Sequence, residues 1–210
     1  MQPDEFVTYF KTCRASAILR TDDAEAAAPA MDAAVRAGFR IGEFTLTIPN
    51  ALELIRAFSQ RDDLVVGAGT VLTVEDAERA VEAGARYLVS PVVDEAVIEA
   101  AGRLGVAAMP GTHTPTEMWR AHRAGARLQK LFPAAGIGAK YVKACLGPMP
   151  FLNIVPTHGV HASNAISYLK AGAHAIGFVA PLFDPELMRS HNFDGIEERA
   201  RKLLAAVHSD

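Results

Sequence analysis

The sequence contains few of the residues that mark several large classes of protein. Only two cysteines, Cys13 and Cys145, occur among 210 residues, too few for a disulfide framework or a thiolate metal site. No run approaches the roughly 18 consecutive apolar residues that span a bilayer. The N-terminal MQPDEFVTYF lacks the cationic segment and apolar core of a signal peptide. We therefore expect a soluble, cytoplasmic protein with no membrane partner.

An excess of positive charge is absent as well. The 21 lysines and arginines are outnumbered by 24 aspartates and glutamates, which gives a net charge of −3. We therefore expect no nucleic-acid partner, because the chain offers no general basic field. Half of the residues are hydrophobic and 21% are charged, a balance typical of a globular protein. No Pro-, Gly- or Ser-rich linker interrupts the chain, so we predict one domain over residues 1–210.

The sequence does contain a regular alternation of short apolar runs and Ala-rich amphipathic segments. Segments such as TVEDAERAVEAGA begin after Thr, Ser or Asp and end at Gly, as helices do. Eight strand-and-helix units predict an α/β fold with a parallel sheet. An open doubly wound sheet fits this alternation, but the count and the length favour a single (β/α)8 TIM barrel. We expect an extra N-terminal helix within residues 1–14 to close the bottom of the barrel. The predicted strands are 16–20, 40–46, 64–70, 86–90, 106–110, 127–132, 151–157 and 174–179.

One lysine stands inside an apolar run, LQKLFPAAG at residues 128–136. Burying an unpaired ammonium group is costly, so Lys130 should be neutral, paired or chemically employed. The alternation of side chains along a strand allows Lys130 and Glu43 to point into the barrel. Arg20 and Thr70 end two other strands at the C-terminal face, where the active sites of such barrels lie. We predict that these four side chains share one site.

These residue types suit chemistry on a 2-oxo acid. A desolvated lysine amine can attack a carbonyl group to form a Schiff base, and a nearby carboxylate can move the protons. An arginine and a hydroxyl group can hold a carboxylate. The residues alone leave a second interpretation open, in which Lys130 and Glu43 form a structural ion pair across the barrel.

Seven motifs occur in order along nearly the whole chain: AILR, EFTLTIP, VGAGTVLTVEDA, VSPVVDE, MPGTHTPTE, KLFPA and VPTHGV. Through them the chain, from about Ala15 to Leu204, resembles the class I KDPG/KHG aldolase family. These enzymes cleave 2-keto-3-deoxy-6-phosphogluconate (KDPG) or 4-hydroxy-2-oxoglutarate (KHG) to pyruvate and an aldehyde. The resemblance implies a homotrimer of barrels, a small 2-oxo acid substrate and no cofactor.

The resemblance also implies roles for individual residues. Lys130 of KLFPA matches the Schiff-base lysine, and Glu43 of EFT matches the general acid/base. Thr70 of GAGT matches a pyruvate-binding threonine. Arg20 of AILR is expected to bind the substrate carboxylate, because Thr47 stands where some members carry an arginine. Residues expected to line the substrate site besides Arg20 and Thr70 are Thr47, Pro91, Phe132, Thr157, His158, Gly159, Gly177 and Phe178.

Two loops depart from the family pattern. The expected PTGG reads PTHG, with His158 in place of a glycine, and the Gly-Ser turn after the last strand reads IGFVAP. In the family both loops bind the substrate phosphate through backbone N–H groups and a serine hydroxyl. Unless His158 or His161 supplies a replacement donor, we expect a less phosphorylated or non-phosphorylated keto-deoxy sugar acid, or KHG.

Three other functions fit parts of the pattern. A metal-dependent aldolase needs several carboxylates at the strand ends, and only Glu43 qualifies clearly, so we expect no metal. A sugar-phosphate isomerase or epimerase uses a barrel of similar size but has no need of Lys130 as a nucleophile. The altered loops permit a non-catalytic keto-acid-binding barrel, which the presence of both Lys130 and Glu43 disfavours.

Overall fold

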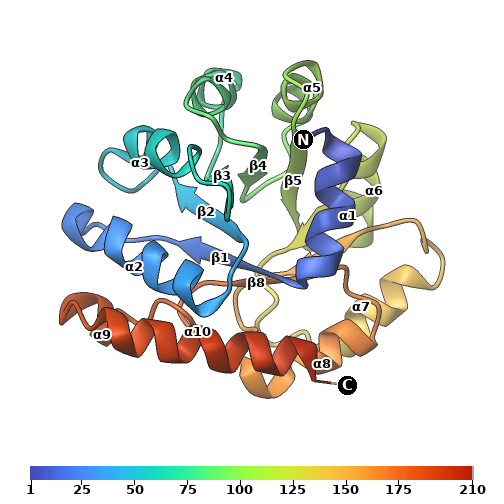
Figure 1. Ribbon diagram of the computed structural model, residues 1–210. Helices are drawn as coiled ribbons and strands as arrows, with labels where there is room; N and C mark the ends of the chain where they lie inside the picture. Colours follow the sequence, from blue (N-terminus) through green and yellow to red (C-terminus); the bar gives the residue numbers. More distant parts are fainter. Residues whose placement is uncertain (210) are drawn as a thin grey trace.

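The computed structural model describes residues 1–209, in which strands and helices alternate along the chain (Figure 1). The strands are β1 (Ala15–Leu19), β2 (Ile41–Thr45), β3 (Val65–Gly69), β4 (Tyr87–Ser90), β5 (Ala107–Thr112), β6 (Gln129–Leu131), β7 (Ile154–Pro156) and β8 (Ile176–Phe178). The helices are α1 (Pro3–Cys13), α2 (Ala24–Ala37), α3 (Ala51–Phe58), α4 (Val74–Glu82), α5 (Glu95–Arg103), α6 (Pro115–Arg123), α7 (Ala139–Leu146), α8 (Ala162–Lys170), α9 (Pro185–Arg189) and α10 (Phe193–His208).

The eight strands form one parallel sheet that closes on itself. Their order is β7-β6-β5-β4-β3-β2-β1-β8, and a parallel bridge between Thr157 and Gly177 joins the two ends. The (β/α)8 barrel predicted from the sequence is therefore confirmed. The observed strands lie within or close to the predicted ranges, and several are shorter, β6 having only three residues.

Helices α4, α5 and α6 begin where the sequence places capping residues. The side chains of Thr73 and Thr114 each accept a hydrogen bond from the backbone N–H three residues later. In both capping boxes the carboxylate of that later residue accepts a hydrogen bond from the backbone N–H of the threonine. Asp94 caps α5 in the same way with a single bond, to the backbone N–H of Val97. These local signals set where these three helices start, and hence where the loops after β3, β4 and β5 end.

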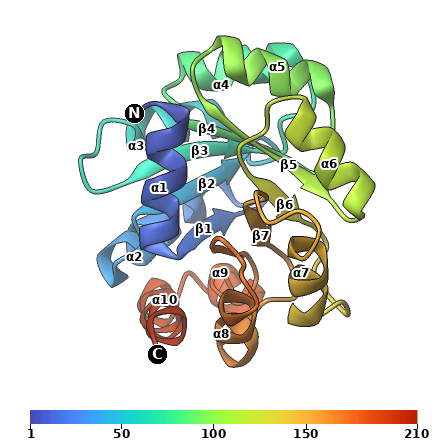
Figure 2. The same ribbon diagram turned by 90° about the vertical axis from the view of Figure 1, so that its right-hand side faces the viewer.

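The first helix, α1, packs across the N-terminal end of the barrel. Figure 2 shows it in front of the strands. Phe6 and Phe10 are fully buried against inward-facing residues, and the Phe6 ring stacks on Tyr87 with 4.5 Å between ring centroids. The backbone carbonyl of Val7 also lies 2.9 Å from Nε2 of His174, just before β8. Aromatic side chains of α1 thus fill the N-terminal end of the barrel interior.

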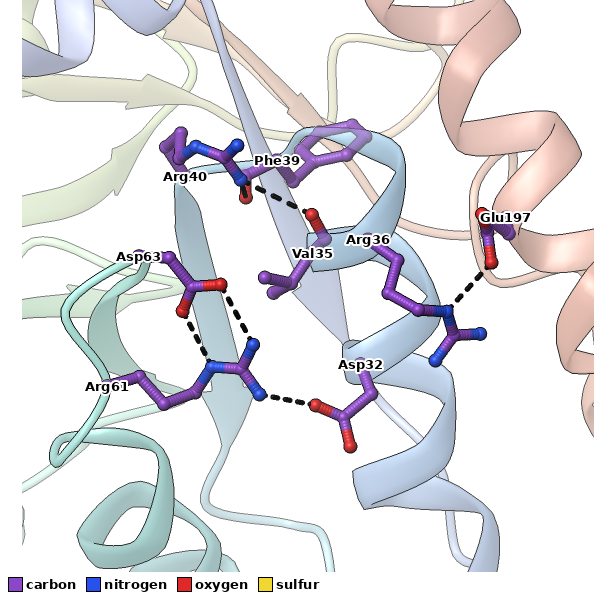
Figure 3. Close-up of polar contacts among 8 residues, drawn as sticks. All are labelled: Asp32, Val35, Arg36, Phe39, Arg40, Arg61, Asp63 and Glu197. Atoms are coloured by element: carbon purple, nitrogen blue, oxygen red, sulfur yellow. Dashed lines mark hydrogen bonds and ion pairs between the residues drawn. The ribbon is translucent and has the colours of Figure 1, made fainter.

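The outward face of the sheet packs against the ring of helices, largely through small side chains. Five alanines of α2 are fully buried, and this helix lies beside α10 (Figure 1). Figure 3 shows the polar contacts at its edge: Arg36 pairs with Glu197 of α10, and Arg61 joins Asp32 to Asp63. Such partly exposed pairs contribute about 0–1 kcal/mol each. Among the described residues, none of the helices is both long enough and apolar enough to cross a membrane.

Candidate active site

Lys130 and Glu43 lie inside the barrel, on opposite parts of the sheet. Lys130 is the central residue of β6 and is only 5% exposed, while Glu43 is the central residue of β2 and is 1% exposed. Leu128, just before β6, and Ile41 of β2 each lie two residues earlier in the chain and belong to the interior cluster that contacts α1. Because side chains two apart share a face, both charged groups point inward, as the sequence predicts.

Burial shifts the pKa of both groups toward their neutral forms. Desolvation raises the pKa of Glu43, and the positive charges of Lys130 and Arg20 oppose that rise. Desolvation likewise lowers the pKa of Lys130; the Glu43 charge opposes this shift and Arg20 adds to it. A larger fraction of Lys130 is therefore a free amine near neutral pH than for an exposed lysine, as a carbonyl-attacking nucleophile requires.

Arg20 and Thr70 meet at the C-terminal edge of the barrel. Arg20 directly follows β1 and donates a hydrogen bond from Nη2 to Oγ1 of Thr70 over 3.4 Å. Thr70 follows β3 with a φ of +59°, a left-handed conformation that few threonines adopt. The sequence suggests that Val66 and Ala68 share the inward face with Thr70, but both pack outward against the helices. The turn in the backbone, rather than strand alternation, places the Thr70 hydroxyl beside Arg20.

Glycines make room for Glu43, Tyr87 and the backbone of Pro91. A Cβ on Gly69 would overlap the Glu43 carboxyl group, with Cδ only 2.7 Å away. A Cβ on Gly67 would lie 2.5 Å from the Tyr87 ring, and one on Gly111 would overlap the backbone of Pro91. Inward-facing positions of the GAGT motif are therefore glycines because neighbouring side chains occupy that space.

The KLFPA and PTHG segments lie against each other beside Lys130. The Phe132 ring centroid is 5.3 Å from Nζ of Lys130 and 6.0 Å from the centroid of the His158 ring. A Cβ on Gly159 would lie 2.5 Å from Cα of Ala135 in the loop after β6. His158 itself has a φ of +65°, the kind of conformation that glycine adopts without strain.

The remaining predicted site residues fall in different places. Thr157 is fully buried, and its Oγ1 lies 2.5 Å from where a Cβ of the inward-facing Gly177 would stand. Pro91 is half-buried after β4, and Thr47 is exposed, with its hydroxyl 2.9 Å from that of Thr45. Phe178 differs from the expectation: its ring lies in the outer core, edge-on to Phe39 at 6.4 Å.

Phe178 points outward because it follows Gly177 directly. Adjacent residues of a strand face opposite sides, and Gly177 holds the inward position. The sequence alone could not separate the two, since both residues are buried and β8 has only three residues. Ser16 of β1 is also fully buried. The alternation of side chains predicts only that it faces the barrel interior and gives it no role.

A parallel (β/α)8 barrel with a lysine and a carboxylate buried in its interior, and an arginine and a threonine at the C-terminal edge of the sheet, defines an enzyme suited to carbonyl chemistry. The model of the KDPG and KHG aldolase family matches residues 7–199. The chain belongs to this family and is an aldolase, a lyase that breaks a carbon–carbon bond.

Individual relatives agree with this assignment. A probable 2-dehydro-3-deoxy-6-phosphogalactonate aldolase of Rhizobium meliloti is 34% identical over 193 residues, covering 90% of this chain and 89% of its own. The KHG/KDPG aldolase of Escherichia coli K12 is 31% identical, covering 86% and 85%. The KDPG aldolase of Legionella pneumophila, solved with pyruvate captured as a covalent carbinolamine, has a TM-score of 0.85 at 26% identity and covers 94% and 97%.

Proposed function

We propose that the protein is a class I aldolase in which Lys130 forms a Schiff base with C2 of a 2-oxo acid. The observation that carries the proposal is the placement of Lys130 inside the barrel, 5% exposed, with a pKa lowered chiefly by desolvation. The neutral amine attacks C2, and loss of water from the carbinolamine leaves a protonated imine. That imine accepts the electron pair of the C3–C4 bond when the bond breaks.

Glu43 moves the protons of this cycle. Its carboxyl group faces the interior, and burial raises its pKa toward the range in which a carboxyl group both gives and takes protons. Protonated Glu43 supplies the proton that leaves with the carbinolamine hydroxyl as water. The carboxylate then takes the proton of the C4 hydroxyl as the aldehyde forms, and it returns a proton to C3 of the enamine before hydrolysis releases pyruvate.

Arg20 and Thr70 hold the carboxylate of the 2-oxo acid. Arg20 has no carboxylate partner among the ion pairs of residues 1–209, and its guanidinium already contacts the Thr70 hydroxyl. Phe132, Pro91 and Thr157 line the three-carbon part of the site. Thr47 lies farther out on the same edge, and Phe178 acts only by packing behind Gly177.

The substrate is a 2-keto-3-deoxy sugar acid of the KDPG type, or KHG. Both substrates appear in the name of the Escherichia coli relative. The altered PTHG and IGFVAP loops favour an acid with little or no phosphate, because Val179 and Ala180, which follow β8, supply no hydroxyl group. We assign His158 to the aldehyde end of the substrate and to selection among these acids; the proximity of its ring to that of Phe132 supports the assignment.

Reductive trapping tests the chemistry independently of the sugar. Incubation with pyruvate and sodium borohydride should add one reduced pyruvate to Lys130, seen by peptide mass spectrometry. Lys130→Ala should abolish both trapping and turnover, while Lys140→Ala, at an exposed position of α7, should change neither. An isomerase or epimerase would form no reducible imine. Full turnover by Lys130→Ala would overturn the assignment.

A coupled assay tests the substrate. Pyruvate release, followed with lactate dehydrogenase, is compared for 2-keto-3-deoxygluconate, its 6-phosphate and KHG at equal concentrations. We expect the free acid or KHG to give the larger kcat/KM. A strong preference for the 6-phosphate would contradict this part of the proposal and would mean that the backbone amides of the two loops still bind an anion.

We also propose that the chain assembles as a homotrimer, as its resemblance to the family implies. Trp119 is 43% exposed and Phe151 is 47% exposed, and their rings stand 6.0 Å apart, an apolar pair that a partner chain would cover. Light scattering after size exclusion measures the assembly directly; a monomer at micromolar concentration would contradict it. The cytoplasmic location expected from the sequence stays a prediction.

A further inference from the structure

Within residues 1–209, four buried side-chain oxygen atoms have no hydrogen-bond partner: Oγ of Ser16, both carboxyl oxygens of Glu43 and Oγ1 of Thr157. All three residues are at most 1% exposed. Buried polar groups are nearly always paired, so a cluster of unpaired ones points to a polar ligand that they share. The proposed function uses Glu43 and Thr157 but gives no role to Ser16.

Strand pairing brings the three residues together around two apolar neighbours. Gly177 of β8 pairs with Ser16 of β1 on one side and with Thr157 on the other. Ile18, on the same face as Ser16, pairs with Glu43 of β2. Gly177 has no side chain, and where its Cβ would stand, Oγ1 of Thr157 and Cδ1 of Ile18 lie 2.5 and 2.7 Å away. The three residues with unpaired oxygens thus lie on neighbouring strands or strand ends of the barrel, with Gly177 and Ile18 between them.

The other buried hydroxyl groups of the barrel behave differently. Thr45 is bonded to Thr47, Thr112 donates to the Lys130 carbonyl, and Ser90 donates to the carbonyl of Val92. Each of these three buried hydroxyl groups therefore has a hydrogen-bond partner within the protein. Ser16 stands between Ala15 and Ala17, so an alanine at this position would continue the run without leaving a polar atom unpaired.

We propose that Ser16 is a positioning residue that, together with Thr157, holds one water molecule against the Glu43 carboxyl group. This inference rests on the proposed function of Glu43. The water donates a hydrogen bond to the carboxylate and accepts from a hydroxyl group. It also relays the proton between Glu43 and C3 of the enamine: the water takes one proton from protonated Glu43 and gives another to C3, and is itself unchanged.

The proposal predicts a direction for the pH dependence. A hydrogen-bond donor to a carboxylate favours its charged form. Without the Ser16 hydroxyl the water that donates to Glu43 is no longer held, so Ser16→Ala should raise the pKa of Glu43. The other groups that act on Glu43 are Lys130 and Arg20, which favour the carboxylate, and Tyr87, whose own pKa the Glu43 charge raises. None of these three is changed by a substitution at Ser16.

Exchange of the pyruvate methyl protons with D2O, followed by NMR, is the test. This half-reaction needs the Lys130 imine and a proton acceptor but no sugar acid. We expect Ser16→Ala to slow the exchange about tenfold, the loss expected for one hydrogen bond to a charged group, and to move its midpoint to higher pH. Borohydride trapping of pyruvate should be unchanged. Ser59→Ala, a serine substitution at the end of α3, should leave both rates unchanged.

Two further substitutions of nearly equal volume, one with and one without a hydroxyl group, separate the effect of the hydroxyl from that of packing. They also keep the test valid if Ser16→Ala does not fold. Ser16→Thr should retain most of the exchange rate, and Ser16→Val should lose it, because the two side chains differ in little but the hydroxyl. Equal loss in both, or a Ser16→Ala rate and midpoint like those of the unaltered enzyme, would overturn the role of Ser16. If the unaltered enzyme is neither trapped by borohydride nor exchanges, the proposed function itself is wrong.

Discussion

Gly69 and Glu43 are in contact across neighbouring strands of the barrel, so that a Cβ on Gly69 would overlap the Glu43 carboxyl group. Gly69 thereby fixes where the carboxyl group can lie. We expect Gly69→Ala to push the carboxyl group away from the reacting atoms and to lower kcat about 100-fold, as a displacement near 1 Å can do. Steady-state kinetics of pyruvate release measures the effect.

Gly102→Ala is the matched control for that substitution. Gly102 lies in α5, and a Cβ there meets nothing within 4 Å. Its replacement should leave kcat unchanged and raise the free energy of unfolding by about 0.5–1 kcal/mol. A Gly69→Ala enzyme with full activity would show that the carboxyl group has other productive positions.

The coupling of three charges predicts how the pKa of Lys130 responds to substitution. Desolvation is the largest cause of its lowering; the Glu43 charge raises this pKa and the Arg20 charge lowers it. Glu43→Gln should therefore shift the pH midpoint of imine formation with pyruvate downward, and Arg20→Met should shift it upward. Rapid-mixing borohydride trapping across pH measures both midpoints. Shifts of the opposite sign would mean that the charges do not interact as their placement implies.

Restoring the family pattern in the two altered loops should restore selectivity for phosphate. His158→Gly removes a side chain from a left-handed backbone position, and Ala180→Ser returns a hydroxyl group to the turn after β8. The double variant should raise kcat/KM for the 6-phosphate relative to the free acid by about tenfold, the contribution of one hydrogen bond to a charged group. Parallel assays of the two acids measure this ratio of kcat/KM values. An unchanged ratio would mean that other residues determine the selectivity for phosphate.

Tyr87 links α1 to the floor of the site. Its ring stacks on Phe6, and its hydroxyl donates a 2.9 Å hydrogen bond to the carbonyl of Gly42, next to Glu43. Tyr87→Phe leaves that buried carbonyl without its donor and should lower the free energy of unfolding by about 1–3 kcal/mol. Urea denaturation measures the loss. Because the ring remains in place, kcat should fall by much less than in Gly69→Ala.

The amino-acid sequence by itself determined the order of the elements and the two buried charges. Capping residues such as Thr73 and Thr114 are local signals, read from neighbours a few positions away. Lys130 and Glu43 were predictable because a charge within an apolar run is unusual and because the geometry of a strand allows such a side chain to face the barrel interior. The motifs added the family to which the chain belongs.

Only the tertiary structure decided which face of each short strand points inward. Strands of a parallel barrel are buried on both sides, so their hydrophobic pattern carries no alternation to read. The orientation of Phe178, the turn that brings Thr70 to Arg20, and the unpaired buried oxygens of Ser16, Glu43 and Thr157 all depend on how eight strands close together. Contacts between residues distant in the chain have no local signal, because packing of the whole barrel selects them.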